Sequence, residues 1–189
     1  MTKKQLTRCN GRWTEAQFLS FIRSTLRSKF LRYPVRYDVL KESRIPYAGE
    51  DKRVKWQYVC SLCQGKILQK DVDIDHHPIE CGSLQKLEDL PRFVDNLFCN
   101  SSNLRIVCRG CHKIHTYASK ENVGFEEAIR MKEAIAFSSL PSKEQIERLE
   151  ALGLMSEKVK NATQRKEVYL NYLNEKALEK EDGTYHCNP

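Results

Sequence analysis

The chain has 189 residues, of which 40% are hydrophobic and 30% are charged, so it can bury a core and its composition excludes an intrinsically disordered protein. No apolar run approaches the length of a membrane span, and the first residues lead into polar sequence. We therefore expect a cytoplasmic protein with no signal peptide and no contact with a membrane. The net charge of +7 and the pI near 9.0 indicate a polyanionic partner.

The charge is unevenly distributed and divides the chain into three regions. Residues 1–57 hold 14 Lys and Arg against 5 Asp and Glu, which gives a net charge of +9. Residues 58–120 carry +1 and contain most of the Cys and His residues, and residues 121–189 carry −3. This distribution is typical of a protein whose N-terminal region contacts phosphates.

Two basic helices are expected in residues 1–57. The first should begin at Thr14, which can form a capping box with Gln17. Pro34 suits the first turn of a second helix over residues 34–44, and a loop is expected over 45–55. The apolar face of the first helix is predicted at Phe18, Phe21, Ile22 and Leu26.

The central region, residues 58–120, is predicted to contain two short strands. Apolar and acidic residues alternate over 71–75, and a second apolar run lies at 104–107. A helix is expected between them at about 90–98, and another directly after the second strand at about 109–119.

The last region, residues 121–189, is predicted to be helical. Helices are expected at about 125–135, 142–152 and 159–179. The tail over 181–189 is expected to be loose, and its His186 and Cys187 are not expected to be ligands.

Four cysteines form two Cys-x-x-Cys pairs, Cys60 with Cys63 and Cys108 with Cys111. This spacing lets both thiolates of a pair bind one tetrahedral ion, and four thiolates make a closed structural zinc site. In a reducing compartment such pairs are metal ligands more often than disulfides. The alternatives are buried free thiols or a redox pair, although a redox pair needs only one such motif.

Histidines gather in the same stretch of sequence. His112 follows Cys111 directly, and His115 shares a helix face with it. The first strand can bring Asp75 and His76 opposite this helix. A carboxylate and one or two imidazoles can hold a second, open metal ion while a remaining imidazole acts as general base. The alternative is a simple surface pair between Asp75 and His112.

This arrangement resembles the HNH nucleases. Their ββα-metal core carries Asp-His on the first strand, Asn on the second and His on the helix. The matching residues are Asp75-His76, Asn103 and His112, and the four cysteines are similar to those of the zinc-stabilised branch. The segment Trp13-Thr-Glu-Ala-Gln-Phe also looks like phage-encoded members. The resemblance covers about residues 10–120.

The resemblance implies an α+β fold in which a ββα-metal (His-Me finger) core is stapled by zinc, with basic N-terminal helices and a helical C-terminal extension. It also implies residue roles. Asp75 and His112 would bind one Mg²⁺ or Mn²⁺ ion at the scissile phosphate, with His115 as a further ligand or phosphate contact. His76 would deprotonate the attacking water, and Asn103 would brace the loop that holds it.

One departure from the family pattern leaves two residues in competition for the base. The family usually places two residues between Asp-His and Pro, whereas here His77 alone separates His76 from Pro78. In the nuclease-toxin branch a His-His pair supplies a ligand and then the base, which would make His77 the base. The acidic residue at position 75 favours His76.

The sequence therefore predicts a metal-dependent HNH DNA endonuclease that leaves 5′-phosphate and 3′-hydroxyl ends, located in the host cytoplasm if phage-encoded. One alternative is a non-catalytic zinc-dependent DNA-binding protein. Another is an accessory factor of phage packaging or host takeover, with residues 121–189 binding a protein partner or a second copy of the chain. The expected contacts to the DNA backbone are Arg23, Arg27, Arg32, Arg36, Arg105, Arg109 and Lys113.

Overall fold

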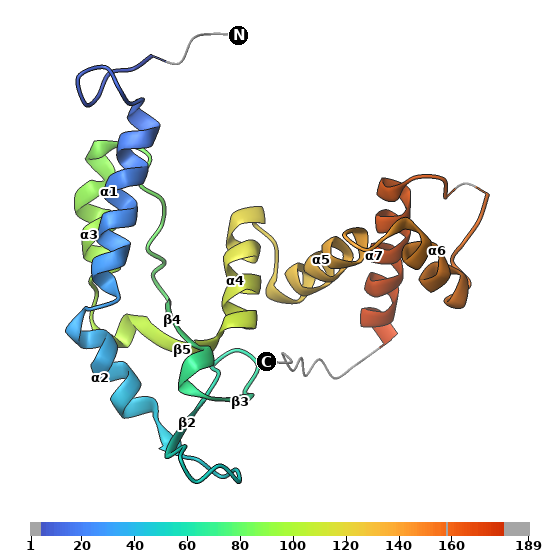
Figure 1. Cartoon of the computed structure of the whole chain (residues 1–189), viewed down its shortest axis with the longest axis horizontal. Coiled ribbons are helices and arrows are strands. Elements are labelled where there is room, and N and C mark those ends of the chain that lie inside the picture. The colour runs from blue at the N-terminus through green and yellow to red at the C-terminus, as the bar shows by residue number, and fades with distance from the viewer. Residues whose placement is uncertain (1–4, 158, 180–189) are drawn as a thin grey trace. The chain divides into compact units, whose positions relative to one another are not determined.

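The computed structural model describes residues 5–157 and 159–179 (Figure 1). Contacts between Cα atoms divide the chain into two compact units, and the division falls between Cys108 and Arg109, inside the region predicted at 58–120. The predictions for the tail over 181–189, including His186 and Cys187, lie outside the described residues. Within the described ranges, no helix has both the length and the apolar composition that a membrane span requires.

The first unit begins with two helices, α1 (Glu15–Phe30) and α2 (Pro34–Ser43). The predicted capping box is present, because Gln17 N donates to Thr14 Oγ1 and Thr14 N donates to Gln17 Oε1. The helix α2 begins at Pro34, whose fixed φ suits the first turn. Both helices therefore start where their capping chemistry predicts.

The buried face of α1 is rotated from the predicted one. Leu19 and Phe30 are buried, whereas Phe21 is 54% exposed. The prediction of Phe21 as a core residue is therefore wrong. Its ring lies against Trp13, with centroids 5.3 Å apart, so it finds its neighbour in the segment before the helix instead of in the core.

Two small antiparallel sheets follow. In the first, β2 (Trp56–Val59) pairs with both β1 (Ile45–Pro46) and β3 (Lys66–Ile67). The strand β1 lies in the segment predicted as a loop, which is a correction for these two residues. In the second, β4 (Val72–His76) pairs with β5 (Leu104–Cys108), close to the predicted positions.

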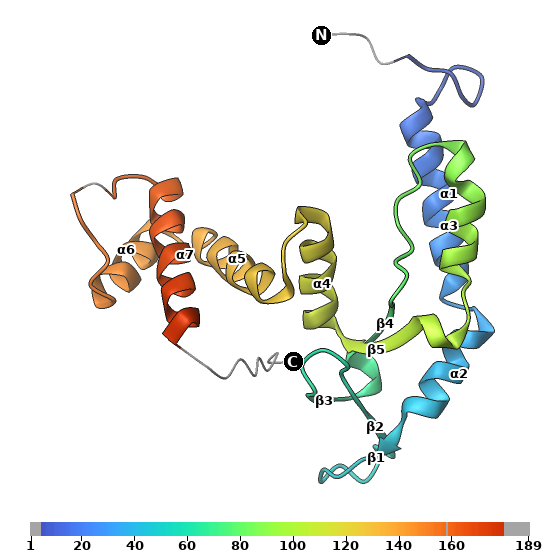
Figure 2. The same cartoon turned by 180° about the vertical axis from the view of Figure 1, so that it is seen from behind.

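The helix α3 (Leu90–Leu97) lies between β4 and β5 in sequence and beside α1 in space (Figure 1 and Figure 2). Its Phe93 and Leu97 are 2% exposed and form part of the core with Val107 of β5. Three single-turn helices complete the unit at Gln69–Asp71, Leu87–Asp89 and Ser101–Asn103. The core thus forms around the strands that carry the predicted site.

The second unit is helical, and the helices predicted after residue 121 lie within it. Its helices are α4 (Arg109–Glu121), α5 (Phe125–Ser138), α6 (Ser142–Ala151) and α7 (Ala162–Glu179). Ile114 and Ala118 of α4 pack against Ala128 and Ile129 of α5. A second cluster joins Phe137, Leu149 and Val159. The helices of this unit therefore share apolar faces along the chain.

Candidate functional site

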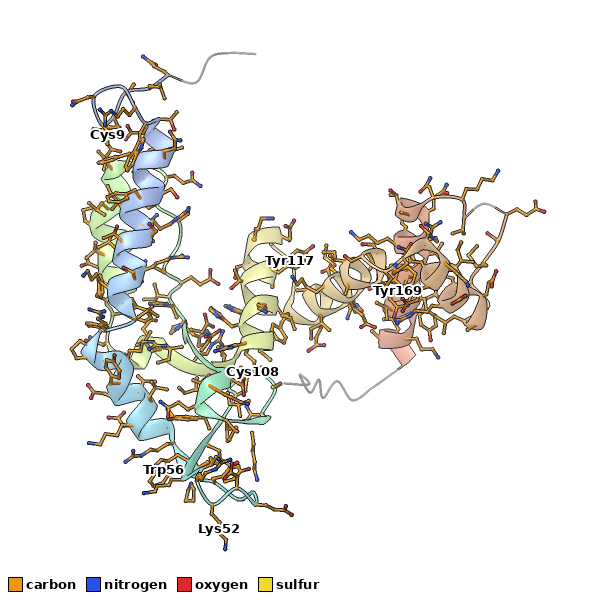
Figure 3. The ribbon with its side chains drawn as sticks, viewed as in Figure 1. Cys9, Lys52, Trp56, Cys108, Tyr117 and Tyr169 are labelled. Carbon is orange, nitrogen blue, oxygen red and sulfur yellow. The ribbon has the colours of Figure 1, made fainter. Side chains whose placement is uncertain are left out.

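Four cysteine sulfurs form a buried cluster. The Sγ atoms of Cys60, Cys63, Cys108 and Cys111 all lie within 4.8 Å of one another. Cys60 and Cys111 are fully buried, and the other two are at most 8% exposed (Figure 3 labels Cys108). Four thiolates suit a closed structural site for a metal ion such as zinc, since no position is left for water or substrate. The structure thus brings together the four predicted ligands in a cluster that could hold such an ion.

A tight turn between β2 and β3 presents the first cysteine pair. Gln64 N donates to Cys60 O at 2.9 Å, and Cys60 N donates to Gly65 O at 3.0 Å. The backbone N–H of Cys108 donates to the Sγ of Cys60 at 3.3 Å. A hydrogen bond of this kind stabilises the negative charge of a thiolate ligand, so the local backbone supports metal binding.

A backbone hydrogen bond places this turn against the second sheet, and a glycine leaves space for one of its sulfurs. Ser61 N donates to the carbonyl oxygen of Ile106 in β5 at 2.9 Å. A Cβ atom at Gly65 would lie 3.3 Å from the Sγ of Cys63, closer than ordinary van der Waals contact. Glycine therefore leaves the space that this sulfur occupies.

The imidazole of His76 is held from two sides. Its Nε2 lies 3.0 Å from the carbonyl oxygen of Leu97, and its ring packs against Phe30 with centroids 5.0 Å apart. A carbonyl oxygen only accepts hydrogen bonds, so this contact assigns a proton to Nε2. In the neutral ring Nδ1 then carries the lone pair and is the atom able to accept a proton.

Tyr33 and Phe98 reinforce the support around this ring. The hydroxyl of Tyr33 donates to the carbonyl oxygen of Phe98 at 2.8 Å. Their rings meet edge to face, and Phe98 also makes an edge contact with Phe30. The end of α1 and the end of α3 are therefore tied together where both contact His76.

Asn103 binds the segment that follows β4. Its Oδ1 accepts from Ile79 N at 2.9 Å, and its Nδ2 donates to Ile79 O at 2.8 Å. The backbone carbonyl of Asn103 also accepts from His77 N at 2.9 Å. The side chain of His77 is exposed, whereas Asn103 is 8% exposed. One buried residue therefore fixes the two positions on either side of Pro78.

Asp75 forms a buried ion pair with Arg105. The Nε and Nη2 atoms of Arg105 donate to the same oxygen, Asp75 Oδ2, at 2.9 and 2.8 Å. The two residues lie opposite each other in the β4–β5 ladder, and their side chains are 10% and 15% exposed respectively. The guanidinium predicted to contact DNA thus lies against the carboxylate predicted to bind metal.

The remaining predicted residues lie on helices, except Arg32, which lies in the turn between α1 and α2. His112 and His115 are half-buried on α4, and His112 follows Cys111 of the sulfur cluster directly. Arg23 and Arg36 are half-buried, which limits how far their charges reach solvent. The exposed members of the predicted DNA-binding set are Arg27, Arg32, Arg109 and Lys113.

No protein-family model matches this chain, and no curated protein or solved structure is detectably similar to it. The likeness to HNH nucleases therefore stays an expectation, carried by Asp75, His76, Asn103 and His112.

Sequence reasoning missed the two groups that hold His76. The carbonyl of Leu97 belongs to the last turn of α3, and Phe30 ends α1. The Leu97 carbonyl could have been suspected from the predicted end of a helix near residue 98, because the last carbonyl groups of a helix lack partners within it. For Phe30 there was no signal, because its contact depends on how α1 packs.

Proposed function

We propose that this protein is a metal-dependent DNA endonuclease of the HNH type, hydrolysing phosphodiester bonds to 5′-phosphate and 3′-hydroxyl ends. The observation that carries the proposal is the orientation of His76. The Leu97 carbonyl binds its Nε2, so that Nδ1 is the proton acceptor. A positioned imidazole on a strand is what a general base requires, and it favours His76 over the exposed His77.

The order of elements supports the same proposal. The antiparallel pair of β4 and β5 leads directly into α4, with Asp75-His76 on β4 and His112 on α4. Asn103 precedes β5 and fixes the backbone beyond His76. These are the positions at which an HNH core carries its ligands, base and bracing amide.

In this proposal the residues have distinct roles. His76 takes a proton from the attacking water through Nδ1, and Asn103 holds the segment after β4 in place. A carboxylate and an imidazole are ligands that divalent cations accept, so Asp75 and His112 are the proposed ligands, with His115 as a further one. The Mg²⁺ or Mn²⁺ ion they would hold supplies positive charge for the scissile phosphate and the departing 3′ oxygen.

The sulfur cluster has a separate role in the proposal. Cys60, Cys63, Cys108 and Cys111 hold Zn²⁺ as a structural ion, since four thiolates leave no open position for chemistry. Exposed cations at Arg27, Arg32, Arg109 and Lys113 contact the DNA backbone.

The ion pair of Asp75 favours a second candidate function. Arg105 occupies Oδ2 of the carboxylate that the nuclease would use as a metal ligand. A zinc-dependent DNA-binding protein without catalysis would keep such a pair as a buried link between β4 and β5. This candidate needs the four cysteines but neither His76 nor His112.

Nicking of supercoiled plasmid in Mg²⁺ or Mn²⁺ tests the proposal. The wild type should convert the plasmid to open circles, and His76→Ala should slow this by about 10²–10⁴-fold, the usual contribution of a general base. His77→Ala is the matched control and should keep most of the rate. If His77→Ala nicked the plasmid much more slowly than His76→Ala, His77 would be the base.

A further variant separates chemistry from structure. The side-chain amide of His76→Gln can still donate to the Leu97 carbonyl, but it cannot act as a base at neutral pH. The nuclease proposal expects this variant to be as slow as His76→Ala while melting at the wild-type temperature. DNA binding by the wild type without nicking in any divalent ion would establish the second candidate instead.

A further inference from the structure

The segment from Arg44 to Trp56, which we call the basic hairpin, joins α2 to β2. Its base is the pairing of Ile45 with Gln57 and of Pro46 with Trp56. The ladder continues through a hydrogen bond from Tyr47 N to Lys55 O at 3.1 Å. None of the seven residues predicted above to contact the DNA backbone lies in this segment.

The turn of the hairpin is held by its own contacts. Val54 N donates to Asp51 O at 3.0 Å, and Arg53 N donates to Asp51 Oδ1 at 3.0 Å. The ring of Tyr47 covers Gly49 so closely that a Cβ there would collide with the phenol. The segment is therefore a folded element whose side chains have defined directions.

The hairpin presents surplus positive charge. Arg53 donates through Nε and Nη2 to the carboxylate of Asp51, which neutralises that acid, and this contact lowers the pKa of Asp51. Arg44, Lys52 and Lys55 are exposed, and Glu50 is the one other carboxylate in the segment. Apart from the Asp51–Arg53 pair, the segment thus carries three positive charges and one negative charge.

Trp56 adds an aromatic surface to these charges. It is 41% exposed, while its neighbours Gln57 and Tyr58 in β2 are buried. The guanidinium carbon of Arg44 lies 4.5 Å from the centroid of the Trp56 ring. Trp56 and Lys52 lie at the same end of the first unit (Figure 3). An exposed indole with a guanidinium at its ring, in a segment with surplus positive charge, has the chemistry of a surface on which a nucleobase stacks while phosphates meet the basic side chains.

We propose that the basic hairpin binds an unpaired strand of DNA, with one base stacked on Trp56 and the phosphates contacting Lys52 and Lys55. An unpaired strand fits better than a duplex because stacking needs the face of a base, which a duplex covers with its neighbours. The proposal rests on the proposed function for the identity of the polyanion. It extends that function by placing a single-stranded segment of the substrate on a surface separate from His76.

Fluorescence of Trp56 gives a direct test. The chain contains two tryptophans, so the variant Trp13→Phe leaves Trp56 as the single reporter. Titration of this full-length variant with oligothymidine, without added divalent ion, should quench its emission. A duplex of the same length should quench it much less. Absence of quenching by the strand, or equal quenching by the duplex, would overturn the proposal.

Affinity and its salt dependence provide the second readout. Trp56→Ala should weaken binding of the strand by about tenfold, the scale of one lost stacking contact. Lys52→Ala with Lys55→Ala should reduce the slope of log K against log salt by about 1.4, since each phosphate contact on a single strand contributes about 0.7. The matched control, Lys143→Ala with Lys160→Ala, removes two exposed lysines of the second unit and should leave the slope unchanged.

Unchanged affinity in Trp56→Ala, or equal slopes in the two double variants, would contradict the proposal. These readouts are independent of cleavage. A protein that nicks plasmid without quenching of Trp56 remains a nuclease but has no strand-binding hairpin. A protein that shows the quenching without nicking binds strands through the hairpin and is not a nuclease.

Discussion

A single side-chain amide fixes the segment that follows β4. Asn103 donates to and accepts from the backbone of Ile79, and it is buried while doing so. An aspartate at this position would keep the acceptor but turn a second oxygen toward the Ile79 carbonyl. Two acceptors would then face each other, and a buried carboxylate would lack one of its donors.

We expect Asn103→Asp to lower the free energy of unfolding by about 1–3 kcal/mol, the usual effect of an unsatisfied buried polar group. The measurement is urea denaturation followed by circular dichroism. Asn100→Asp makes the same change at an exposed position and should shift stability by less than about 0.5 kcal/mol. Equal midpoints for Asn103→Asp and the wild type would show that the amide does not hold the segment.

The thiol of Cys81 lies in the same segment and should respond to pH. Burial raises its pKa above the ordinary value of 9.0, and the nearby Arg27 opposes the shift without cancelling it. A raised pKa keeps the thiol neutral at neutral pH, and the thiolate is the reactive form. Pulse alkylation at pH 8 read by mass spectrometry should therefore modify the exposed Cys9 well before Cys81.

The reactivity of Cys81 should continue to rise as the pH passes above 9. Labelling of Cys81 at pH 8 as fast as that of Cys9 would contradict the raised pKa.

At the scale of residues, interactions set by spacing along the chain could be predicted, whereas those set by the pairing register of two strands could not. Two residues separate Cys60 from Cys63, so their shared role follows from the sequence alone. The pair of Asp75 and Arg105 arises because the β4–β5 ladder places them opposite each other. No local sequence pattern predicts that register. The sequence therefore predicts Arg105 as a contact to the DNA backbone and does not predict its ion pair with Asp75.

At the scale of elements, α1 shows what local sequence can determine. Thr14 and Gln17 satisfy each other's backbone N–H groups at its start. We expect Thr14→Ala to destabilise the protein by about 1 kcal/mol in urea denaturation, since the side-chain acceptor is lost. Thr25→Ala on the exposed side of the same helix should be neutral or stabilising, because alanine favours the helix interior. The prediction fails if both variants unfold at the same urea concentration.

The short strands could not be predicted for a physical reason. The strands β1 and β3 have two residues each, too few for an alternating pattern, and they exist because β2 pairs with them. The rotation of the α1 face has a similar cause. Phe21 has the right spacing for a core position, but the tertiary packing of α1 buries Leu19 and Phe30 instead.

At the scale of the whole molecule, the sulfur cluster links segments that are far apart in sequence. The ligands come from the turn after β2, the end of β5 and the first turn of α4. Metal binding to structural zinc sites is worth about 10–16 kcal/mol in small domains, comparable with the whole stability of a folded chain at about 5–15 kcal/mol. If the cluster holds zinc, the stability of the small sheets around it should therefore depend on that ion.

We expect Cys108→Ser to release zinc and to abolish the cooperative melting of the first unit, measured by metal analysis and thermal circular dichroism. Cys9→Ser replaces an exposed cysteine outside the cluster and should retain both. Native-like melting of Cys108→Ser at wild-type temperature would rule out a structural role for the metal.

The division of the chain after Cys108 also has a physical cause. The sequence pattern groups α4 with the strands because its cysteine and histidines belong to the same motif. The apolar face of α4, formed by Ile114 and Ala118, packs instead on α5. Its cysteine thus groups α4 with the strands, whereas its apolar packing groups it with α5. A sequence pattern shows the cysteine spacing more clearly than it shows which helix an apolar face packs on.

Gly65 has a consequence for genetic screening. A Cβ atom there would lie 3.3 Å from the Sγ of Cys63, so a larger side chain would require that sulfur to shift by a few tenths of an ångström. If the proposed nicking activity is present, a library selected for its loss would return substitutions at Gly65 together with those at His76. Counting zinc atoms per purified chain would separate the two groups, because a displaced Cys63 sulfur should lower zinc occupancy in the Gly65 variants, whereas His76 is not one of the four cysteines of the cluster.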